Sequence, residues 1–575
     1  MSVVASAAFI RLPVWRARFV LALLLAAFGV LVGRAVYLQA IDTDFLQMKG
    51  ESRFSRVLQV PATRGRVLDR NGEAVAISTP VKSIWAIPED ASVSATQLKS
   101  LASVLNVDPE ELGKRLADTK RDFVYLKRQI SPEQAERVAE LGLEGVFAQR
   151  EYRRYYPGGD SMAHVIGFTD VGDAGQEGIE LAFESSLAGK AGSRRVIKDR
   201  LGRIVEDIES IRVAQDGRDL TLSIDGRIQN IAFGALKSAV EAHKAKAGAI
   251  VVLDVSSGEV LALANMPTYN PNNRGKLTGA QLRNRVITDI FEPGSTLKPF
   301  TVALAVDEGR VRPDTMIQTA PGRLTIAKHT IHDAHAEGAL SVAQVIQKSS
   351  NVGAAKIALG LPREDMWNMF RRVGFGAPPA LGFPGEAHGK VRDWKTWRPI
   401  EQATMAYGHG ISVSLIQLAR AYSIFARDGE LVPLTLVRSD MPVAGRRVIS
   451  AETARALRGM LELAVQSGGT APRARVMGYR VAGKTGTAHK QENGKYAAHK
   501  YISSFVGFAP VSNPRLVIAV MIDEPSNGQY YGGAVAAPVF SHVMQGTLRV
   551  LGVAPDAPML PVELPGEGQD LKEET

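Results

Sequence analysis

The 575-residue chain contains no cysteine, and this absence removes several kinds of chemistry at once. Without thiols there can be no disulfide framework, no thiolate metal site, no cysteine nucleophile and no lipid-modified cysteine. Charged residues make up 22% of the chain and hydrophobic residues 45%, which is ordinary for a globular protein and argues against bulk disorder. The length is sufficient for two or three domains.

Signatures of nucleic-acid binding are also missing, since no helix-turn-helix, zinc-finger or aromatic RNA-binding pattern occurs. The formal net charge is +10, so we expect a basic surface close to anionic lipid or cell-wall polymer rather than a nucleic-acid partner. No internal repeat is present.

A long hydrophobic run lies near the N-terminus. Phe19 to Gly33 is unbroken, and the apolar pattern resumes at residues 35–38 after Arg34, which together approach the roughly 20 residues of a membrane span. A charged residue inside this run is costly in lipid unless it pairs, so Arg34 hints at a membrane-embedded partner.

The charges on either side of the run predict its orientation. Basic residues precede it and acidic residues follow it, which holds the leading end in the cytoplasm and sends the rest of the chain outward. The flanking residues are Arg11, Arg16, Arg18, Asp42 and Asp44. A cleaved signal peptide is the alternative, but no good small-x-small cleavage site follows. We therefore predict a cytoplasmic segment over 1–18 and a transmembrane anchor over 19–40.

The region 41–218 is predicted to be a non-catalytic domain of strands, turns and helices. Asn71-Gly72 indicates a hairpin, because both residues tolerate positive φ. Tyr155 to Gly159 forms a rigid turn, and a helix is expected from about Gln176 to Leu187. Nothing in this region groups a nucleophile with a base.

A second domain is predicted over 219–553, followed by a disordered tail over 554–575 that is rich in Pro, Gly and acidic residues. Apolar runs form strand pairs near both ends of the domain, and helices lie between them. This order indicates an α+β fold with an antiparallel sheet covered by helices. The expected elements are a helix over 228–240, hairpins over 249–263 and 504–520, and a closing helix over 538–550.

Three short motifs occur in one order inside this second domain. Ser295-Thr296-Leu297-Lys298 stands where a helix is expected to begin, Ser349-Ser350-Asn351 follows an apolar helix, and Lys484-Thr485-Gly486-Thr487 continues a strand. Each motif alone is a weak signal. The combination in this order is specific to penicillin-binding proteins and the β-lactamases related to them.

The residue types agree with acyl transfer through a serine. Lys298 is three residues from Ser295, hence on the same helical face, and a desolvated lysine near a second cation, here Lys484, can serve as the base that the hydroxyl requires. Ser349 can relay a proton to the leaving amine, and Asn351 can fix Lys298 and a substrate amide.

The remaining atoms of the motifs suit a peptide that ends in a free carboxylate. A backbone N–H at the start of the Ser295 helix and one near Thr487 can bind the oxyanion. Lys484, Thr485 and Thr487, with Gly486 between them, can bind the substrate carboxylate. We therefore expect attack at the last peptide bond of the substrate.

The chain resembles the class B (monofunctional) penicillin-binding proteins, and within them the septal peptidoglycan D,D-transpeptidases of the FtsI type. Besides the three motifs, the resemblance rests on the short N-terminal segment with its single anchor and on several turns of the chain. These segments are Arg64-Gly65, Asp69 to Gly72, Arg154 to Gly159, Gly175 to Glu180 and Pro267 to Asn273.

The resemblance implies a non-catalytic pedestal over 41–218 and a transpeptidase domain over 219–553. It implies an inner-membrane enzyme with its catalytic domain in the periplasm at the division septum. Such an enzyme cross-links peptidoglycan stem peptides, releases D-alanine through a Ser295 acyl-enzyme and is a target of β-lactams. Partners implied by the family are lipid II-derived glycan, a membrane glycan polymerase of the FtsW kind and other divisome proteins. No cofactor is expected.

Further side chains are weaker candidates for substrate contact. Tyr407, Tyr530 and Tyr531 either line the cleft or serve packing, and His489 follows the third motif on the same strand. His332, Asp333 and His335 resemble metal ligands, but a turn with polar surface residues is the preferred interpretation, and no metal is expected.

Three other functions fit the sequence less well than transpeptidation. A bifunctional class A synthase is disfavoured, because no glycosyltransferase carboxylate motif precedes the second domain. A β-lactam-sensing receptor would not need the pedestal, and a non-enzymatic scaffold would fail to be acylated. A main septal enzyme and a conditionally used paralogue fit the sequence equally well.

Overall fold

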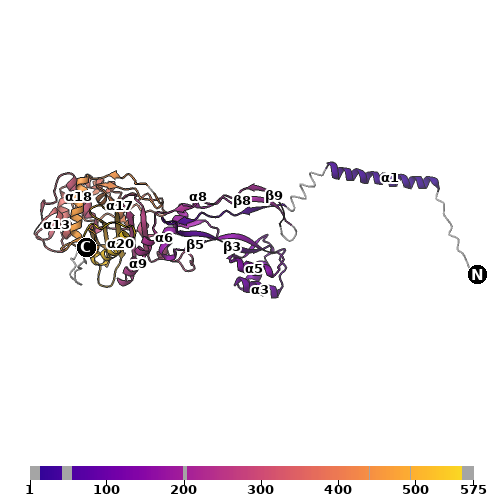
Figure 1. The fold of residues 1–575 in the computed structure, drawn as a ribbon, viewed down its shortest axis with the longest axis horizontal. Helices are drawn as coiled ribbons and strands as arrows, with labels where there is room; N and C mark the ends of the chain where they lie inside the picture. Colours follow the sequence, from indigo (N-terminus) through magenta and orange to yellow (C-terminus); the bar gives the residue numbers. More distant parts are fainter. Residues whose placement is uncertain (1–12, 42–54, 199–203, 440, 493, 560–575) are drawn as a thin grey trace, which may run out of the picture. The chain divides into compact units, whose positions relative to one another are not determined.

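A computed structural model describes residues 13–41, 55–198, 204–439, 441–492 and 494–559. By contacts, the chain divides into two compact units (Figure 1). Unit 1 comprises 1–62, 81–151 and 190–215, and unit 2 comprises 63–80, 152–189 and 216–575. Two segments upstream of the predicted boundary at 218/219 thus belong to the same unit as the three motifs.

The N-terminal hydrophobic run is one continuous helix. Helix α1 (Val14–Val36) continues into a π-helical turn, η1 (Tyr37–Ile41). The stretch Val14–Gln39 contains an 18-residue window with a mean hydropathy of 2.4 and is long and apolar enough to cross a bilayer. The helix begins before the predicted residue 19, so Arg16 lies within its first turn. Every side chain of α1 is exposed. Arg11, Asp42 and Asp44 lie outside the described residues.

Unit 1 contains two small sheets and a group of short helices. One sheet has the antiparallel order β1-β8-β9, and in the other, residues 82–86 of β3 pair antiparallel with β4. Capping boxes at Ser94 and Ser131 begin α3 and α5, and the Asp108 carboxylate caps α4. The elements are β1 (Ser55–Val60), β3 (Ala74–Ala86), α3 (Ala95–Leu105), α4 (Pro109–Leu116), β4 (Val124–Ile130), α5 (Pro132–Glu140), β5 (Val146–Tyr155), β8 (Gly192–Lys198) and β9 (Ile204–Arg212).

The predicted Asn71-Gly72 hairpin is confirmed, with a different turn geometry. Only Gly72 has a positive φ, of 89°, because the Asp69 carboxylate accepts hydrogen bonds from the backbone N–H groups of Asn71 and Glu73 and fixes the turn. The expected helix over 176–187 is interrupted at Phe183. The upstream elements of unit 2 are β2 (Val67–Leu68), the start of β3, α6 (Gly159–Ile166), β6 (Phe168–Thr169), β7 (Gly175–Glu177), α7 (Gly178–Ala182), α8 (Glu184–Leu187) and β10 (Leu220–Thr221).

A five-stranded antiparallel sheet is the frame of unit 2, in the order β12-β11-β23-β22-β21. It contains both predicted hairpins, and alternate residues of its strands face opposite sides. Ile250 and Val252 pack with helices α9 and α20, whereas Ala249 and Val251 pack with α17 on the other face. The bounds are α9 (Gly226–Ala242), β11 (Ala247–Asp254), β12 (Val260–Met266), α17 (Leu415–Ala426), β21 (Ala482–Glu492), β22 (Lys495–Ala509), β23 (Leu516–Asp523) and α20 (Ala537–Val550).

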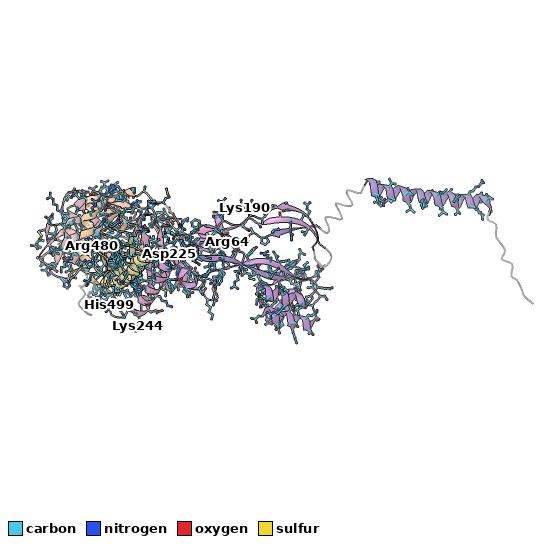
Figure 2. All side chains as sticks on the ribbon, in the orientation of Figure 1. Arg64, Lys190, Asp225, Lys244, Arg480 and His499 are labelled. Carbon is cyan, nitrogen blue, oxygen red and sulfur yellow. The ribbon has the colours of Figure 1, made fainter. Side chains whose placement is uncertain are left out.

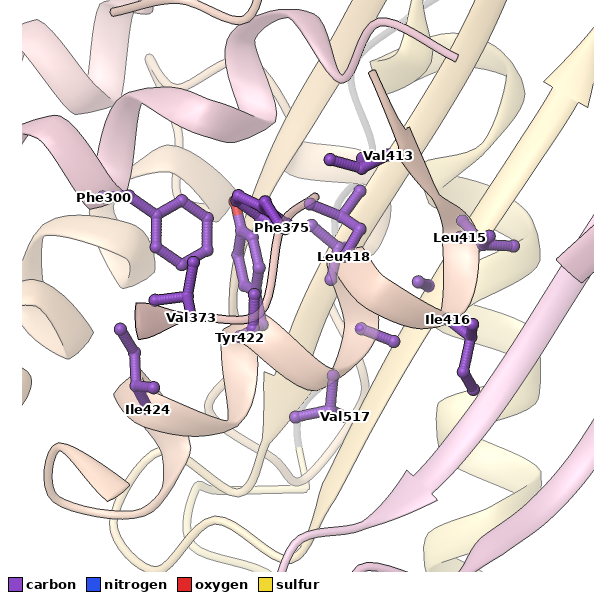
Figure 3. Close-up of a cluster of buried hydrophobic side chains, with 14 of the residues drawn as sticks. Phe300, Val373, Phe375, Val413, Leu415, Ile416, Leu418, Tyr422, Ile424 and Val517 are labelled. Carbon is purple, nitrogen blue, oxygen red and sulfur yellow. The ribbon is translucent and has the colours of Figure 1, made fainter. Parts of the chain in front are cut away.

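The helical layer on the α17 face surrounds an aromatic core (Figure 3). The Phe300 ring packs against Phe375, Tyr422 and Phe425 with ring centroids 5.1–5.5 Å apart. Side chains fill the unit, with Asp225 buried at the N-cap of α9 and Arg480 and His499 exposed (Figure 2). Other helices here are η2 (Gly294–Leu297), α12 (Lys298–Asp307), α13 (Val342–Lys348), α14 (Asn351–Leu359), α15 (Arg363–Arg372), α16 (Pro399–Met405), α18 (Ala451–Val465) and α19 (Gly532–Val535).

The predicted disordered tail starts too early, at residue 554. Residues 554–559 belong to the described part of the chain, where the Asp556 carboxylate accepts hydrogen bonds from the backbone N–H groups of Arg480 and Ser512. These bonds fix a segment whose composition alone favoured disorder. Residues 560–575 lie outside the described residues.

A buried ion cluster joins the upstream segments of unit 2. The Glu180 carboxylate, fully buried, pairs with Arg64 at 2.6 Å and with Arg154 at 2.7 Å. Next to it, burial raises the pKa of Asp173 to about 6, although Arg64 and Arg154 act in the opposite direction. One Asp173 oxygen is buried without a hydrogen-bond partner. Such a carboxylate opposes folding when it is charged.

We predict that Asp173→Asn reduces the pH dependence of stability. The pKa of this carboxyl is about 6 in the folded protein, against an ordinary value of 3.8, so the folded state binds more protons and stability falls as pH rises between those values. The melting temperature of the full-length protein in detergent should drop by about 1–3 °C more between pH 4.5 and 7 than that of the variant. Asp170→Asn, an exposed carboxylate in the same turn, is the control. Identical pH profiles for Asp173→Asn and the wild type would contradict this assignment.

Candidate active site

Ser295 lies in the short helix η2, immediately before α12. Lys298 is the first residue of α12 and is fully buried, and its Nζ lies 2.9 Å from the Ser295 Oγ. The predicted contact between these side chains, three residues apart on a helix, is therefore present. A hydrogen bond of 2.7 Å from the Tyr422 hydroxyl to the Thr296 carbonyl holds this turn from the aromatic core.

The turn that presents Ser295 depends on a close backbone contact. Gly294 has a φ of 55°, and a side chain on Gly408 would meet the Gly294 carbonyl oxygen at 2.3 Å. Both positions therefore require glycine. The loop that follows α16 is thereby pressed against the residue that precedes Ser295.

Ser349 supplies two further contacts to Lys298. It ends α13 in the left-handed conformation, with φ 61° and ψ 38°, which is uncommon for a residue other than glycine. In this conformation its carbonyl oxygen and its Oγ both face Lys298, and the Nζ–Oγ distance is 3.0 Å. The first two motifs thus meet at one buried amino group.

Asp333 holds the second motif in place. Its carboxylate accepts hydrogen bonds from the Ser350 hydroxyl at 2.7 Å and from the Val352 backbone N–H at 2.9 Å, while the Asn351 side-chain amide donates to the His332 carbonyl at 3.1 Å. Asp333 thereby fixes the start of α14, a role that its sequence context did not reveal. Among the described residues no cluster of three metal-ligating side chains occurs.

The third motif lies on a strand, as predicted, and this strand, β21, is at the edge of the sheet. Lys484 is fully buried, and its Nζ lies 3.0 Å from the Thr485 Oγ1, which in turn lies 2.8 Å from the Thr470 Oγ1. The Thr487 Oγ1 accepts a hydrogen bond of 3.0 Å from the Gly532 backbone N–H. These side chains are fixed before any substrate binds.

Strand β21 packs directly against η2, which brings the third motif to the first. A side chain on Gly486 would meet the Pro293 carbonyl oxygen at 2.8 Å, so this glycine permits the approach. The Cβ position of Gly294 is 3.3 Å from the Thr487 carbonyl oxygen. The structure thus brings Ser295, Lys298, Ser349 and the strand carrying Lys484 together in one site.

Aromatic rings form a row beside the third motif. The Tyr501 ring is stacked on Tyr530 at 4.1 Å between centroids and lies 4.7 Å from His489, and Tyr530 is 4.4 Å from Tyr531. Three of these residues, His489, Tyr530 and Tyr531, were singled out from the sequence. Tyr501 was not, because its place opposite His489 follows from the β21–β22 register.

A second set of rings lies near Lys298. Tyr407, whose pKa is raised by burial, is 5.1 Å from His409 between ring centroids, and His409 is 6.1 Å from Tyr496. Burial lowers the pKa of His409 to about 4, so the ring is neutral at pH 7. His409 was missed because a single histidine between two glycines carries no signal in the sequence.

Comparisons with known proteins agree with this geometry. A model of the penicillin binding protein transpeptidase domain matches residues 248–545, and a model of the penicillin-binding protein dimerisation domain matches residues 59–222. The chain is 44% identical over 548 residues to the probable peptidoglycan D,D-transpeptidase PenA of Neisseria gonorrhoeae, covering 95% of this chain and 94% of that protein.

Two further relatives extend this result. The peptidoglycan D,D-transpeptidase FtsI of Escherichia coli (strain K12) is 42% identical over 550 residues, covering 94% of this chain and 93% of that protein. The solved apo structure of the TP domain from Burkholderia pseudomallei penicillin-binding protein 3 matches with a TM-score of 0.55 and 52% identity, covering 59% of this chain and 98% of that one.

We predict that Asp333→Ala impairs the site more than it impairs the fold. The variant loses two hydrogen bonds at the start of α14, which lowers the free energy of unfolding by about 1 kcal/mol, as removal of a helix cap does. It also loosens the turn that orients Ser349 toward Lys298. Because misplacement of about 1 Å can cost about 100-fold, reaction of Ser295 with a fluorescent penicillin should slow by about 10-fold or more. Asp108→Ala, which removes the cap of α4 in unit 1, should leave this rate unchanged. Equal rates in the two variants would show that Asp333 does not position the site.

Proposed function

The chain belongs to the penicillin-binding protein transpeptidase family, and from this premise we propose how its motifs carry out the reaction. It is a serine-type peptidoglycan D,D-transpeptidase that cross-links stem peptides in septal cell-wall synthesis and is a target of β-lactams. The observation that carries the proposed mechanism is the 2.9 Å separation between the buried Lys298 Nζ and the Ser295 Oγ.

In the acylation step, unprotonated Lys298 takes the proton from the Ser295 hydroxyl as the oxygen attacks the carbonyl carbon of the terminal D-Ala–D-Ala bond. The backbone N–H groups of Ser295 and Thr487 stabilise the resulting oxyanion. When the C–N bond breaks, the departing D-alanine amine receives a proton from Lys298 through the Ser349 hydroxyl, which lies 3.0 Å from the Nζ.

The substrate carboxylate is bound by the third motif. Lys484 provides the positive charge, and the hydroxyl groups of Thr485 and Thr487 lie on the same strand. Because β21 is an edge strand, its backbone can pair with an extended donor peptide. Asn351 from the second motif holds a substrate amide, and Tyr407, His489, Tyr530 and Tyr531 line the cleft around the peptide.

Two serine hydroxyls lie equally close to Lys298, and two features favour Ser295 as the nucleophile. Ser295 is at the start of a helix, where backbone N–H groups are available for the oxyanion, whereas Ser349 is at a helix end. Ser295 also belongs to the segment that packs against β21. Only Ser295 combines the base, the oxyanion donors and the carboxylate site.

The second half of the reaction requires an amine rather than water. The amino group of a neighbouring stem peptide attacks the Ser295 ester, Lys298 takes its proton, and the new peptide bond forms as the Ser295 hydroxyl is restored. A hydrolase needs a positioned carboxylate to activate water on this ester. The Glu386 carboxylate, which lies between the second and third motifs in the sequence, instead accepts hydrogen bonds from the backbone N–H groups of Ala380 and Phe383 in its own turn.

We predict that benzylpenicillin adds one drug mass to the protein and that the adduct persists for hours at neutral pH. Without a general base, hydrolysis loses the roughly 10²–10⁴-fold that such a base supplies. Intact-mass measurement of the full-length protein in detergent tests this. Ser295→Ala should show no adduct, and Glu386→Gln should match the wild type. Release of hydrolysed drug within seconds would contradict the assignment as a transpeptidase.

Among the residues that the structure describes, one helix, near the N-terminus, is long and apolar enough for a single-pass membrane anchor. We propose that residues after the anchor face the periplasm, because basic residues precede the apolar run that begins at Phe19, and that the protein acts at the septum with the divisome. Arg34, in the last turn of α1, is the basis for proposing contact with a membrane glycan polymerase of the FtsW kind.

We predict that replacing residues 19–40 with an unrelated apolar span of equal length abolishes association with this polymerase while β-lactam acylation is retained. Co-purification from membranes measures the association. Unchanged association of the chain with the replaced anchor would show that the anchor is not the contact.

The proposed orientation predicts that a reporter that is active only outside the cytoplasm is active when it is fused after Asp44. If only a reporter that works in the cytoplasm were active there, the orientation would be the reverse.

A further inference from the structure

A buried carboxylate that the proposed mechanism does not use lies three residues before Ser295. Glu292 is 9% exposed, and burial raises the pKa of its carboxyl group, against the hydrogen bonds from Gly410 and Tyr496. No cation of the described part of the chain contributes to this shift. A buried carboxylate without a counter-ion is costly, so its hydrogen bonds have to hold it.

Three donors bind the Glu292 carboxylate. The Gly410 backbone N–H donates at 2.8 Å, the Gln491 side-chain amide at 2.9 Å and the Tyr496 hydroxyl at 3.0 Å. Gln491 and Tyr496 stand opposite each other at the free end of the β21–β22 hairpin. Gly410 comes from the loop in which Gly408 packs on Gly294.

The free end of this hairpin protrudes beyond the buried part of the sheet. Gln491 is exposed and Tyr496 is 50% exposed, whereas the residues of the third motif are buried. On the β23 side, Lys490 pairs with Asp523 at 2.7 Å. On the opposite side, the hydrogen bonds that Gln491 and Tyr496 donate to Glu292 connect the same end of the hairpin to the segment that leads into Ser295.

The Tyr496 ring connects this tie to the cleft. Its centroid lies 6.3 Å from that of His489 and 6.1 Å from that of His409. The hydroxyl bond to Glu292 therefore orients a ring that lies between the end of β21 and the loop near Lys298.

We propose that Glu292 is a positioning residue for acyl transfer, which sets the spacing between Ser295 and strand β21 by tying the hairpin end to the nucleophile segment. The inference rests on the proposed function, because it takes Ser295 as the nucleophile and β21 as the strand that binds the donor peptide. Loss of the tie lets the hairpin end move away from Ser295. The donor still binds, but its carbonyl carbon is displaced from the Ser295 oxygen.

The test removes the donors rather than the carboxylate, because Gln491 and Tyr496 are exposed and their substitution leaves the core intact. The full-length Gln491→Ala/Tyr496→Phe protein in detergent is mixed with a chromogenic cephalosporin in a stopped-flow instrument over a range of concentrations. The limiting acylation rate constant should fall by about 10-fold or more, since a displacement near 1 Å can cost about 100-fold. The apparent dissociation constant of the drug should change far less.

Lys500→Ala is the matched control. This residue lies on the same hairpin and pairs with Glu492 at 2.8 Å, and it makes no hydrogen bond to Glu292. Its acylation constants should equal those of the wild type. A general weakening of the hairpin would slow this variant as well and would overturn the specific role of Glu292.

A thermodynamic cycle completes the test. Glu292→Ala combined with the double variant should be no slower than Glu292→Ala alone, because both changes remove the same tie. The proposal would be overturned if the fold-reductions of the limiting acylation rate constant in Glu292→Ala and in the double variant multiplied in the combined variant. It would also be overturned if the double variant kept the wild-type limiting rate constant. If the wild type itself carried no adduct on Ser295, the proposed function would fail instead, so the two failures are distinguishable.

Discussion

The site depends on the burial of one amino group. Lys298 is 0% exposed, and its Nζ contacts the hydroxyl of Ser295 and both side-chain and backbone oxygens of Ser349. In the proposed mechanism, these contacts fix the distance between the Lys298 Nζ and the hydroxyl that it deprotonates. Ser349 can supply two oxygens only because it takes a left-handed conformation, which the packing around it has to maintain.

The rest of unit 2 holds three segments around this amino group. The helical layer anchors the nucleophile turn through Tyr422 and the aromatic core, Asp333 fixes the turn of the second motif, and the sheet presents β21 at its edge. Glycines at the contacts remove the side chains that would keep these segments apart. The motif residues thus sit on rigid elements, which suits the proposed mechanism, in which an acylated serine has to wait for an amine.

The elements with a strong local signal were predictable from the sequence. Continuous apolar runs predicted the sheet hairpins, helical spacing predicted α9, and the order of the motifs singled out Ser295, Lys298 and Lys484. Contacts between distant segments were not predictable, because no local pattern records them. Examples are the hydrogen bond between Gln491 and Glu292, the position of His409 near Lys298, and the assignment of residues 63–80 and 152–189 to unit 2. The ordered residues 554–559 were missed for the same reason, since Asp556 is held by partners far away in the sequence.

In the proposed mechanism Ser295, rather than Ser349 at a similar distance from Lys298, attacks the substrate. The most direct test uses a stem-peptide analogue ending in a D-alanyl thioester, followed by acid quenching, proteolysis and mass mapping of the acyl group. The mechanism predicts the acyl group on the peptide that contains Ser295, and its transfer to an added amine without loss to water. An acyl group on the peptide that contains Ser349, or none on either serine, would contradict it.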